Sequence, residues 1–152
     1  MNIKKSIPNT ITCCSLLSGC VAVLLALRGD LQWAAYWVMA AAIFDFCDGL
    51  AARTLQAFSP IGKDLDSLSD MVSFGVAPGM IVFRLLEEAC QTEPTMGFVP
   101  YLAFVIPVFS ALRLAKFNID ERQTTSFIGM PVPAHALFWA SIGHALQDAV
   151  PV

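Results

Sequence analysis

The chain has 152 residues, of which 57% are hydrophobic and 14% are charged, and its mean hydropathy is +0.66. Soluble domains carry about 25% charged residues, so this composition excludes an ordinary soluble globule and favours lipid as the surrounding solvent. The formal net charge of −3 offers no basic surface to nucleic acid, and we expect no nucleic-acid partner.

Five stretches are apolar enough to be membrane-spanning helices, which need about 20 residues each. The first follows Lys4 and Lys5 without a small-residue cleavage pattern, so we expect it to stay as a membrane anchor. In chain order, the predicted spans are Ile11–Leu27, Trp33–Leu55, Leu65–Leu86, Phe98–Phe117 and Pro131–Gln147. The simplest interpretation is one all-α domain over residues 1–152, a polytopic membrane helix bundle.

The distribution of basic residues predicts the orientation of this bundle. With five alternating spans, seven of the nine Lys and Arg residues fall on one side, which is expected to be the cytoplasmic side. The other two, Arg28 and Arg84, border the opposite face, where the loop is acidic. The seven are Lys4, Lys5, Arg53, Lys63, Arg113, Lys116 and Arg122.

The second and third spans carry four aspartates at helical spacing. Asp45 and Asp48 are three residues apart and share a helix face, and Asp66 and Asp70, four apart, share a face of the next helix. The segment Gln56–Lys63 contains Ser, Pro and Gly and is predicted to be the loop that reverses the chain. The two helices therefore present their carboxylates towards each other.

Four carboxylates in a membrane protein need positive charge, because a single Asp near the bilayer centre costs about 2.5–3.5 kcal/mol and like charges repel. Arg53 and Lys63 are too few to balance them. Two divalent ions, which prefer oxygen ligands, fit better, and Mg²⁺ usually binds carboxylates together with phosphate oxygens. The constellation predicts a metal-dependent site for a phosphate-bearing substrate.

The complete pattern resembles the signature of the CDP-alcohol phosphatidyltransferases. It reads D-x2-D-G-x2-A-R-x8-G-x3-D-x3-D, with its first Asp at Asp45 and its last at Asp70. Four further stretches are similar to one branch, the bacterial CDP-diacylglycerol–serine O-phosphatidyltransferases. These are Ile7–Thr12 with Leu16–Gly19, Asp66–Pro78, Ser110–Asn118 and Phe127–Ala134.

The resemblance implies an integral enzyme of the bacterial inner membrane with its site towards the cytoplasm. The enzyme would transfer a phosphatidyl group from CDP-diacylglycerol to L-serine, with Mg²⁺ or Mn²⁺ as two divalent cofactors. Such proteins have six spanning helices and are usually homodimers, so this chain is expected to lack the last helix. Membrane lipid is an implied partner.

The resemblance also implies the site residues. Asp45, Asp48 and Asp66 would bind the metals, with Asp66 bridging, and Asp70 would touch the second metal and act as general base. The residues implied in binding the CDP-lipid are Asn9, Thr12, Gly49, Ala52, Arg53 and Ser59.

Some of these positions have structural alternatives. Asn9 and Thr12 could instead cap a helix at the membrane surface, and Ala52 could serve helix–helix packing. Lys63 is either a solvated loop charge or a phosphate ligand, and His135 is interpreted as a packed or interfacial histidine.

The acceptor is the least specified part of the prediction. Arg113 is the preferred partner for a serine carboxylate, against ordinary positive-inside anchoring. A sister enzyme that uses glycerol phosphate or inositol phosphate stays open, although such acceptors should demand more cations. A divalent-cation transporter is a further alternative, but its acidic site should lie near the membrane midplane.

Overall fold

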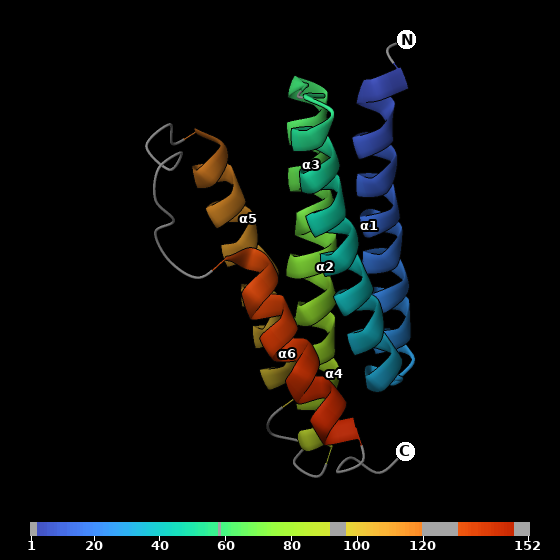
Figure 1. Ribbon diagram of the computed structural model, residues 1–152. Coiled ribbons are helices and arrows are strands. Elements are labelled where there is room, and N and C mark those ends of the chain that lie inside the picture. Colours follow the sequence, from blue (N-terminus) through green and yellow to red (C-terminus); the bar gives the residue numbers. More distant parts are fainter. Residues whose placement is uncertain (1–2, 58, 92–96, 120–130, 148–152) are drawn as a thin grey trace.

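The computed structural model describes residues 3–57, 59–91, 97–119 and 131–147, and this part of the chain is a bundle of helices without strands (Figure 1). The elements in order are α1 Ile3–Leu27, α2 Leu31–Thr54, α3 Pro60–Asp70, the π-helix η1 Met71–Val76, α4 Ala77–Ala89, the 3₁₀-helix η3 Val99–Phe104, α5 Val105–Ile119 and α6 Val132–Leu146. The prediction of an all-α membrane bundle is confirmed.

Four helical stretches are long and apolar enough to cross a membrane. They are Ser6–Leu27, Leu31–Thr54, Pro60–Ala89 and Val99–Ile119. The fifth predicted span is shorter than expected: α6 has 15 residues and therefore a length of about 22 Å, against a hydrocarbon core of about 30 Å. In Figure 1, α6 begins part-way along the bundle and runs to the end opposite the start of α1.

The loop between the acidic helices is shorter than predicted. It was expected to reach Lys63, but α3 already begins at Pro60. Ser59 is the N-cap of this helix, and its Oγ accepts a hydrogen bond of 3.0 Å from the backbone N–H of Gly62. Ser–Pro at a helix start is a strong initiation signal, and here it outweighs the turn tendency of Gly62.

The third span is continuous but not uniform, because the six residues Met71–Val76 form a π-helix directly after Asp70. Pro78 has no N–H to bond the Phe74 carbonyl in an α-helical ladder, and Gly75 is a poor helix former. Both residues weaken the α-helical hydrogen bonds at this point. Hydropathy cannot detect such a change, because it depends on residue type and not on backbone geometry.

Small residues and serines hold the bundle together. Helix α1 packs against α2, α3 and α4, with alanines such as Ala22 and Ala26 completely buried. Ser15 donates a hydrogen bond of 3.0 Å to the Ala41 carbonyl of α2, and Ser73 donates one of 3.0 Å to the Ser15 carbonyl. Close packing of small residues and interhelical hydrogen bonds are the main attractive forces between helices in lipid.

Gly19 is the point of closest approach between α1 and the π-helix. A Cβ added there would lie 2.7 Å from the Cα of Ser73 and closer still to its Oγ. We expect Gly19→Ala to lower the free energy of unfolding by about 1–3 kcal/mol, because backbone must move. Thermal unfolding in detergent measures this.

The matched control is Gly49→Ala, where an added Cβ meets nothing within 4 Å. Alanine is the better helix former by up to about 1 kcal/mol, so this variant should unfold at the same temperature or slightly higher. Equal unfolding temperatures for Gly19→Ala and wild type would contradict the close packing of these two helices.

Candidate metal and nucleotide site

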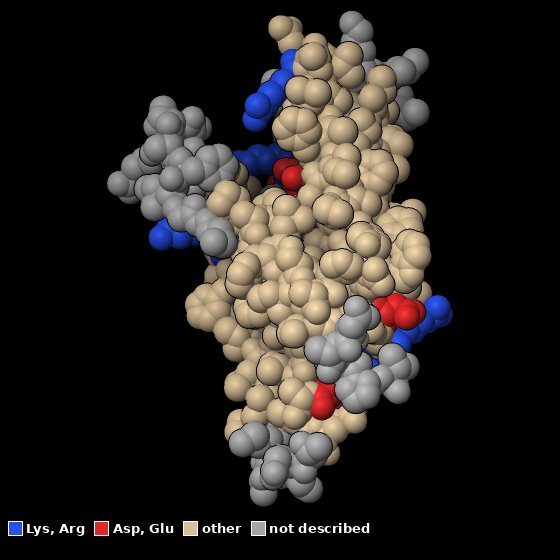
Figure 2. Space-filling view, turned by 60° about the horizontal axis from the view of Figure 1, so that its bottom comes forward, with Lys and Arg blue, Asp and Glu red and all other residues tan. Residues whose placement is uncertain are grey.

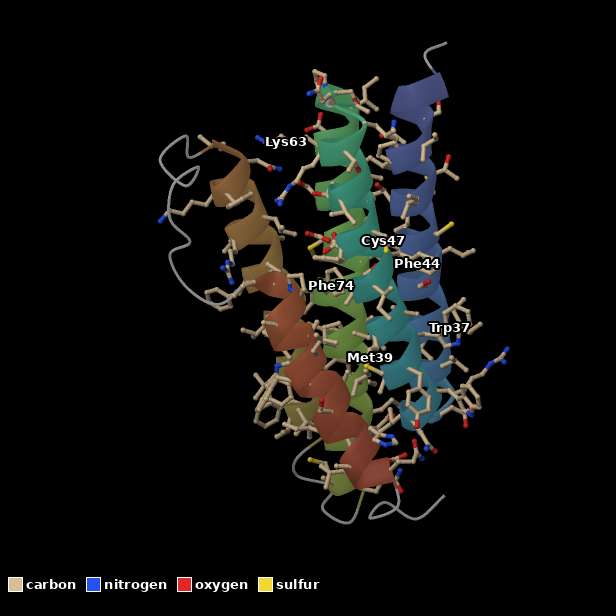
Figure 3. The ribbon with its side chains drawn as sticks, in the orientation of Figure 1. Trp37, Met39, Phe44, Cys47, Lys63 and Phe74 are labelled. Atoms are coloured by element: carbon tan, nitrogen blue, oxygen red, sulfur yellow. The ribbon has the colours of Figure 1, made fainter. Side chains whose placement is uncertain are left out.

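Three carboxylates come together where α2 faces α3. Asp45, Asp48 and Asp66 each offer an oxygen atom, and these three atoms all lie within 4.8 Å of one another. The helical spacing explains this, since Asp45 and Asp48 share one face of α2, whereas Phe44 and Cys47, both labelled in Figure 3, are exposed. Asp48 is the most buried of the three, with 5% of its surface exposed.

Asp70 lies one helical turn after Asp66 and lines the same cavity. It is not one of the three residues whose oxygens lie within 4.8 Å. Its carboxyl group interacts electrostatically with those of Asp45, Asp66 and Asp48. The quartet predicted from the sequence is therefore a compact group of three with a fourth carboxylate beside it.

None of these acids forms an ion pair with a basic side chain in the described part of the chain. Among the residues that the structure describes, the ion pairs are those of Arg84 with Glu87 and Glu88. Within the same part of the chain, two carboxylate oxygens are buried without a hydrogen-bond partner, Oδ2 of Asp48 and Oδ1 of Asp70. Buried carboxylate oxygens normally have a partner, and a hard divalent ion is the partner that suits a group of carboxylates. The donor set therefore fits divalent metal.

The acids line a cavity of about 410 Å³ bounded by α2, α3, α5 and the start of α6. Arg53, Lys63 and Arg113 are also in its wall. Figure 2 shows acidic side chains in a hollow of the surface with basic side chains beside them. Anionic phosphate groups can therefore meet both carboxylate-bound cations and basic side chains in one place.

A second cavity, of about 260 Å³, lies between α1, α2 and α3. It is lined by all six residues expected to bind the CDP-lipid, namely Asn9, Thr12, Gly49, Ala52, Arg53 and Ser59. Five residues line both this cavity and the larger one, and they are Asp48, Gly49, Arg53, Lys63 and Asp66. The two cavities thus meet at the carboxylates.

Several of these residues already have local roles. Thr12 Oγ1 donates a hydrogen bond of 3.0 Å to the Pro8 carbonyl, and Ser59 caps α3 through Gly62. A Cβ on Gly62 would lie 3.1 Å from Oδ1 of Asn9, so glycine permits close packing there. Gly49, in contrast, faces open space on the side where a Cβ would be, and its backbone is accessible to a ligand.

Asn118 has a role that the sequence did not reveal. Its Nδ2 donates a hydrogen bond of 2.9 Å to Oγ of Ser67, and its carbonyl accepts one of 3.3 Å from Nζ of Lys63. These bonds join the end of α5 to α3 across the larger cavity. Lys63, labelled in Figure 3, is exposed at the start of α3 and also lines the larger cavity. The sequence feature that could have indicated this role of Asn118 is the occurrence of polar residues at the ends of two apolar segments.

The remaining basic residues lie in different places. Arg113 is on α5 and lines the larger cavity, whereas Lys116 is exposed in the last turn of the same helix. The side chains of Lys4 and Lys5 and the whole of Arg122 lie outside the described residues.

Comparison with known proteins identifies relatives of the chain. The family profile described as CDP-alcohol phosphatidyltransferase matches residues 5–151. A Bacillus subtilis protein named CDP-diacylglycerol–serine O-phosphatidyltransferase is 39% identical over 127 residues, which cover 84% of this chain and 69% of the relative. A Mycobacterium leprae protein of the same name is 37% identical, covering 86% of this chain and 44% of the relative.

A more distant relative agrees with these matches. A Methanothermobacter thermautotrophicus protein named archaetidylserine synthase is 31% identical, covering 90% of this chain and 59% of the relative. The chain thus spans between about half and two thirds of the length of these curated relatives. No solved structure matches the chain significantly. The matched profile and the bacterial relatives show that the chain belongs to the CDP-alcohol phosphatidyltransferase family.

Proposed function

We propose that the chain transfers the phosphatidyl group of CDP-diacylglycerol to L-serine, forming phosphatidylserine and releasing CMP. The observation that carries this proposal is the group of three carboxylates within 4.8 Å, at the junction of two cavities that also contain Arg53. Phosphoryl transfer needs such a place, where phosphate oxygens meet cations and fixed charges. The printed names of the relatives supply the donor and the acceptor.

The residues that would hold two divalent ions, Mg²⁺ or Mn²⁺, are Asp45, Asp48, Asp66 and Asp70. Bound there, such ions supply Lewis-acid polarisation of the pyrophosphate and neutralise charge on the departing CMP. The partnerless oxygens of Asp48 and Asp70 support this assignment, and so does the shared position of Asp66 in both cavities.

The smaller cavity would take the cytidine end of the donor. Asn9, Thr12 and Ser59 supply polar groups, and the open backbone at Gly49 and the small Ala52 admit the ligand closely. The Arg53 guanidinium can pair with phosphate oxygens through two parallel hydrogen bonds. Together these residues would orient the pyrophosphate against the carboxylates.

Asp70 would act as general base for the acceptor. A serine hydroxyl is a weak nucleophile until a base removes its proton. The Asp70 carboxylate would take that proton while the serine oxygen forms a bond to the phosphorus that carries diacylglycerol. The bond from this phosphorus to the CMP oxygen breaks, and CMP leaves with the electron pair.

Arg113 would bind the carboxylate of serine from the α5 side of the larger cavity. We expect Arg113→Met to raise the KM for serine by about 10- to 100-fold, the effect of losing a charged hydrogen bond of about 1.5–3 kcal/mol. The KM for CDP-diacylglycerol should change little. Lys116→Met is the control, because Lys116 is exposed on the same helix. An equal rise in both KM values would remove Arg113 from the serine site.

The proposed location is the bacterial inner membrane, with the site towards the cytoplasm. Arg53 and Lys63 lie beside the cavity at the end of the bundle where α3 begins, and basic residues favour the cytoplasmic side. A homodimer remains a prediction from the resemblance, and the mass of the purified protein in detergent measures it.

CMP release from CDP-diacylglycerol tests the reaction directly. The purified chain in detergent is assayed with serine, glycerol phosphate or inositol phosphate, each with Mg²⁺, with Mn²⁺ or with chelator. We expect release with serine and a divalent ion and none with chelator. Release with a phosphate-bearing acceptor alone would identify a sister enzyme. Uptake of divalent ions into vesicles without CMP release would identify a transporter.

A further inference from the structure

A third cavity, of about 280 Å³, lies between α5 and α6. Its wall is mostly apolar, but Ser110, Arg113 and His135 contribute polar groups to it. Arg113 and Val132 also line the larger cavity, so the two cavities meet at these residues. Ser110 lies three residues before Arg113, and His135 lies three residues after Val132, so each is about one helical turn from this boundary.

The two ring nitrogens of His135 differ in their surroundings. Nε2 lies 3.0 Å from Oγ of Ser110, and this Oγ donates a hydrogen bond of 2.9 Å to the Ile106 carbonyl. The hydroxyl has one proton, so both contacts are hydrogen bonds when Nε2 carries the ring proton and donates it to Ser110. In this tautomer of the neutral ring Nδ1 is an acceptor, and among the described residues it is buried without a hydrogen-bond partner.

A buried acceptor without a donor costs free energy and is unusual in a native structure, so Nδ1 of His135 calls for a ligand that supplies a donor. Arg113 is close enough to interact electrostatically with the imidazole. A ligand that binds Arg113 through a carboxylate can therefore bring a neighbouring donor to His135. An α-amino acid has this arrangement, because a single carbon joins its carboxylate to an ammonium group with three N–H donors.

We infer that Nδ1 of His135 accepts a hydrogen bond from the ammonium group of the acceptor serine. The inference rests on the proposed function, in which Arg113 binds the serine carboxylate. Contacts at two points restrict the rotation of the bound serine and so fix the direction of its hydroxyl group. A site built to bind a substrate N–H also rejects analogues that lack it, so His135 distinguishes serine from acceptors that carry an acid and a hydroxyl but no amine.

Nitrogen NMR tests this contact without requiring turnover. The protein is labelled with ¹⁵N-histidine in detergent with CMP and Mg²⁺, and its two histidines are distinguished with His144→Gln, since His144 is exposed in the last turn of α6. We expect L-serine to move the Nδ1 resonance of His135 upfield, as for a lone pair that accepts a hydrogen bond. The analogue 3-hydroxypropionate, which lacks the ammonium, should leave it in place. Equal shifts with the two compounds, or no shift with L-serine, would overturn the inference.

Two substitutions of His135 separate the roles of its nitrogens. The amide oxygen of Asn can take the place of Nδ1, whereas the amide of Gln can take the place of Nε2 beside Ser110. We expect His135→Gln to raise the KM for serine about 10- to 100-fold, the effect of losing a hydrogen bond to a charged group. His135→Asn should raise it less. The KM for CDP-diacylglycerol, and kcat/KM with 3-hydroxypropionate as acceptor, should stay close to wild type in both variants.

The outcomes separate this inference from the proposed function. If Asn impaired serine binding as much as Gln or more, the imidazole would act only through Ser110, and the inference would be overturned while the reaction stands. A serine KM that neither variant changes would overturn it as well. Absence of CMP release with every acceptor would instead overturn the proposed function, and the NMR titration with L-serine would then decide alone whether His135 binds the amino acid.

Discussion

Replacing Asp66 with asparagine is expected to lower kcat for CMP release by about 10³-fold, equivalent to about 4 kcal/mol of transition-state stabilisation. Asp66 is the only member of the carboxylate group of three that comes from α3, and it lines both cavities that meet there. Asparagine keeps the size of the side chain but removes its charge, so the loss would reflect weakened metal binding. The measurements are CMP release and Mn²⁺ affinity by electron paramagnetic resonance.

The control for this variant is on the same helix. Asp64 is exposed and lies two residues before Asp66, and it is not among the residues that line the cavities. Asp64→Asn should keep wild-type activity and Mn²⁺ affinity. A weak effect of Asp66→Asn, no larger than that of Asp64→Asn, would show that the group of carboxylates does not bind the catalytic ions.

Asp70→Asn is expected to lower kcat by about 10²- to 10⁴-fold, the usual contribution of a general base. Because Asp70 lies outside the group of three, Mn²⁺ affinity should fall less than in Asp66→Asn. The KM for CDP-diacylglycerol should remain close to the wild-type value.

The comparison of these two variants separates the roles of the acids. If Asp70→Asn weakened Mn²⁺ binding as much as Asp66→Asn does, Asp70 would contribute as much to metal affinity as Asp66 and would not be a separate base. If it left kcat unchanged, the serine proton would have another acceptor. A serine concentration series with each variant measures both possibilities.

The sequence predicted the acid site because two regular helices carry it. Spacings of three and four residues determine which side chains share a helix face, and this is enough to bring Asp45, Asp48 and Asp66 together once α2 and α3 are antiparallel. The family resemblance, and not the helical spacing, implied that Gly49 and Asn9 contact the CDP-lipid, and both line the smaller cavity. The motif alone could not predict which three of the four carboxylates form the most compact group.

The parts that were missed depend on contacts between distant segments or on backbone hydrogen bonding. The early start of α3 follows from the capping bond of Ser59, which the turn tendency of Gly62 concealed. His135 was interpreted as a packed histidine, and its bond to Ser110 fits this, but the cavity that it helps to line was unforeseen. Such a cavity depends on how far α6 extends beside α5, and hydropathy contains no information on this.

The π-helical turn at Met71–Val76 divides one long helix into two halves. Both halves pack against α1, and the second half also packs against η3 and α6. The first half carries Asp66 and Asp70, and the second carries core residues such as Ile81, which is fully buried. A π-helical turn holds about one residue more than an α-helical turn. A single deletion within this segment could therefore be absorbed as ordinary α-helix while the acidic half keeps its alignment with the core half. An added residue turns an α-helix by about 100°, so we expect an insertion here to misalign the carboxylates while the bundle still assembles.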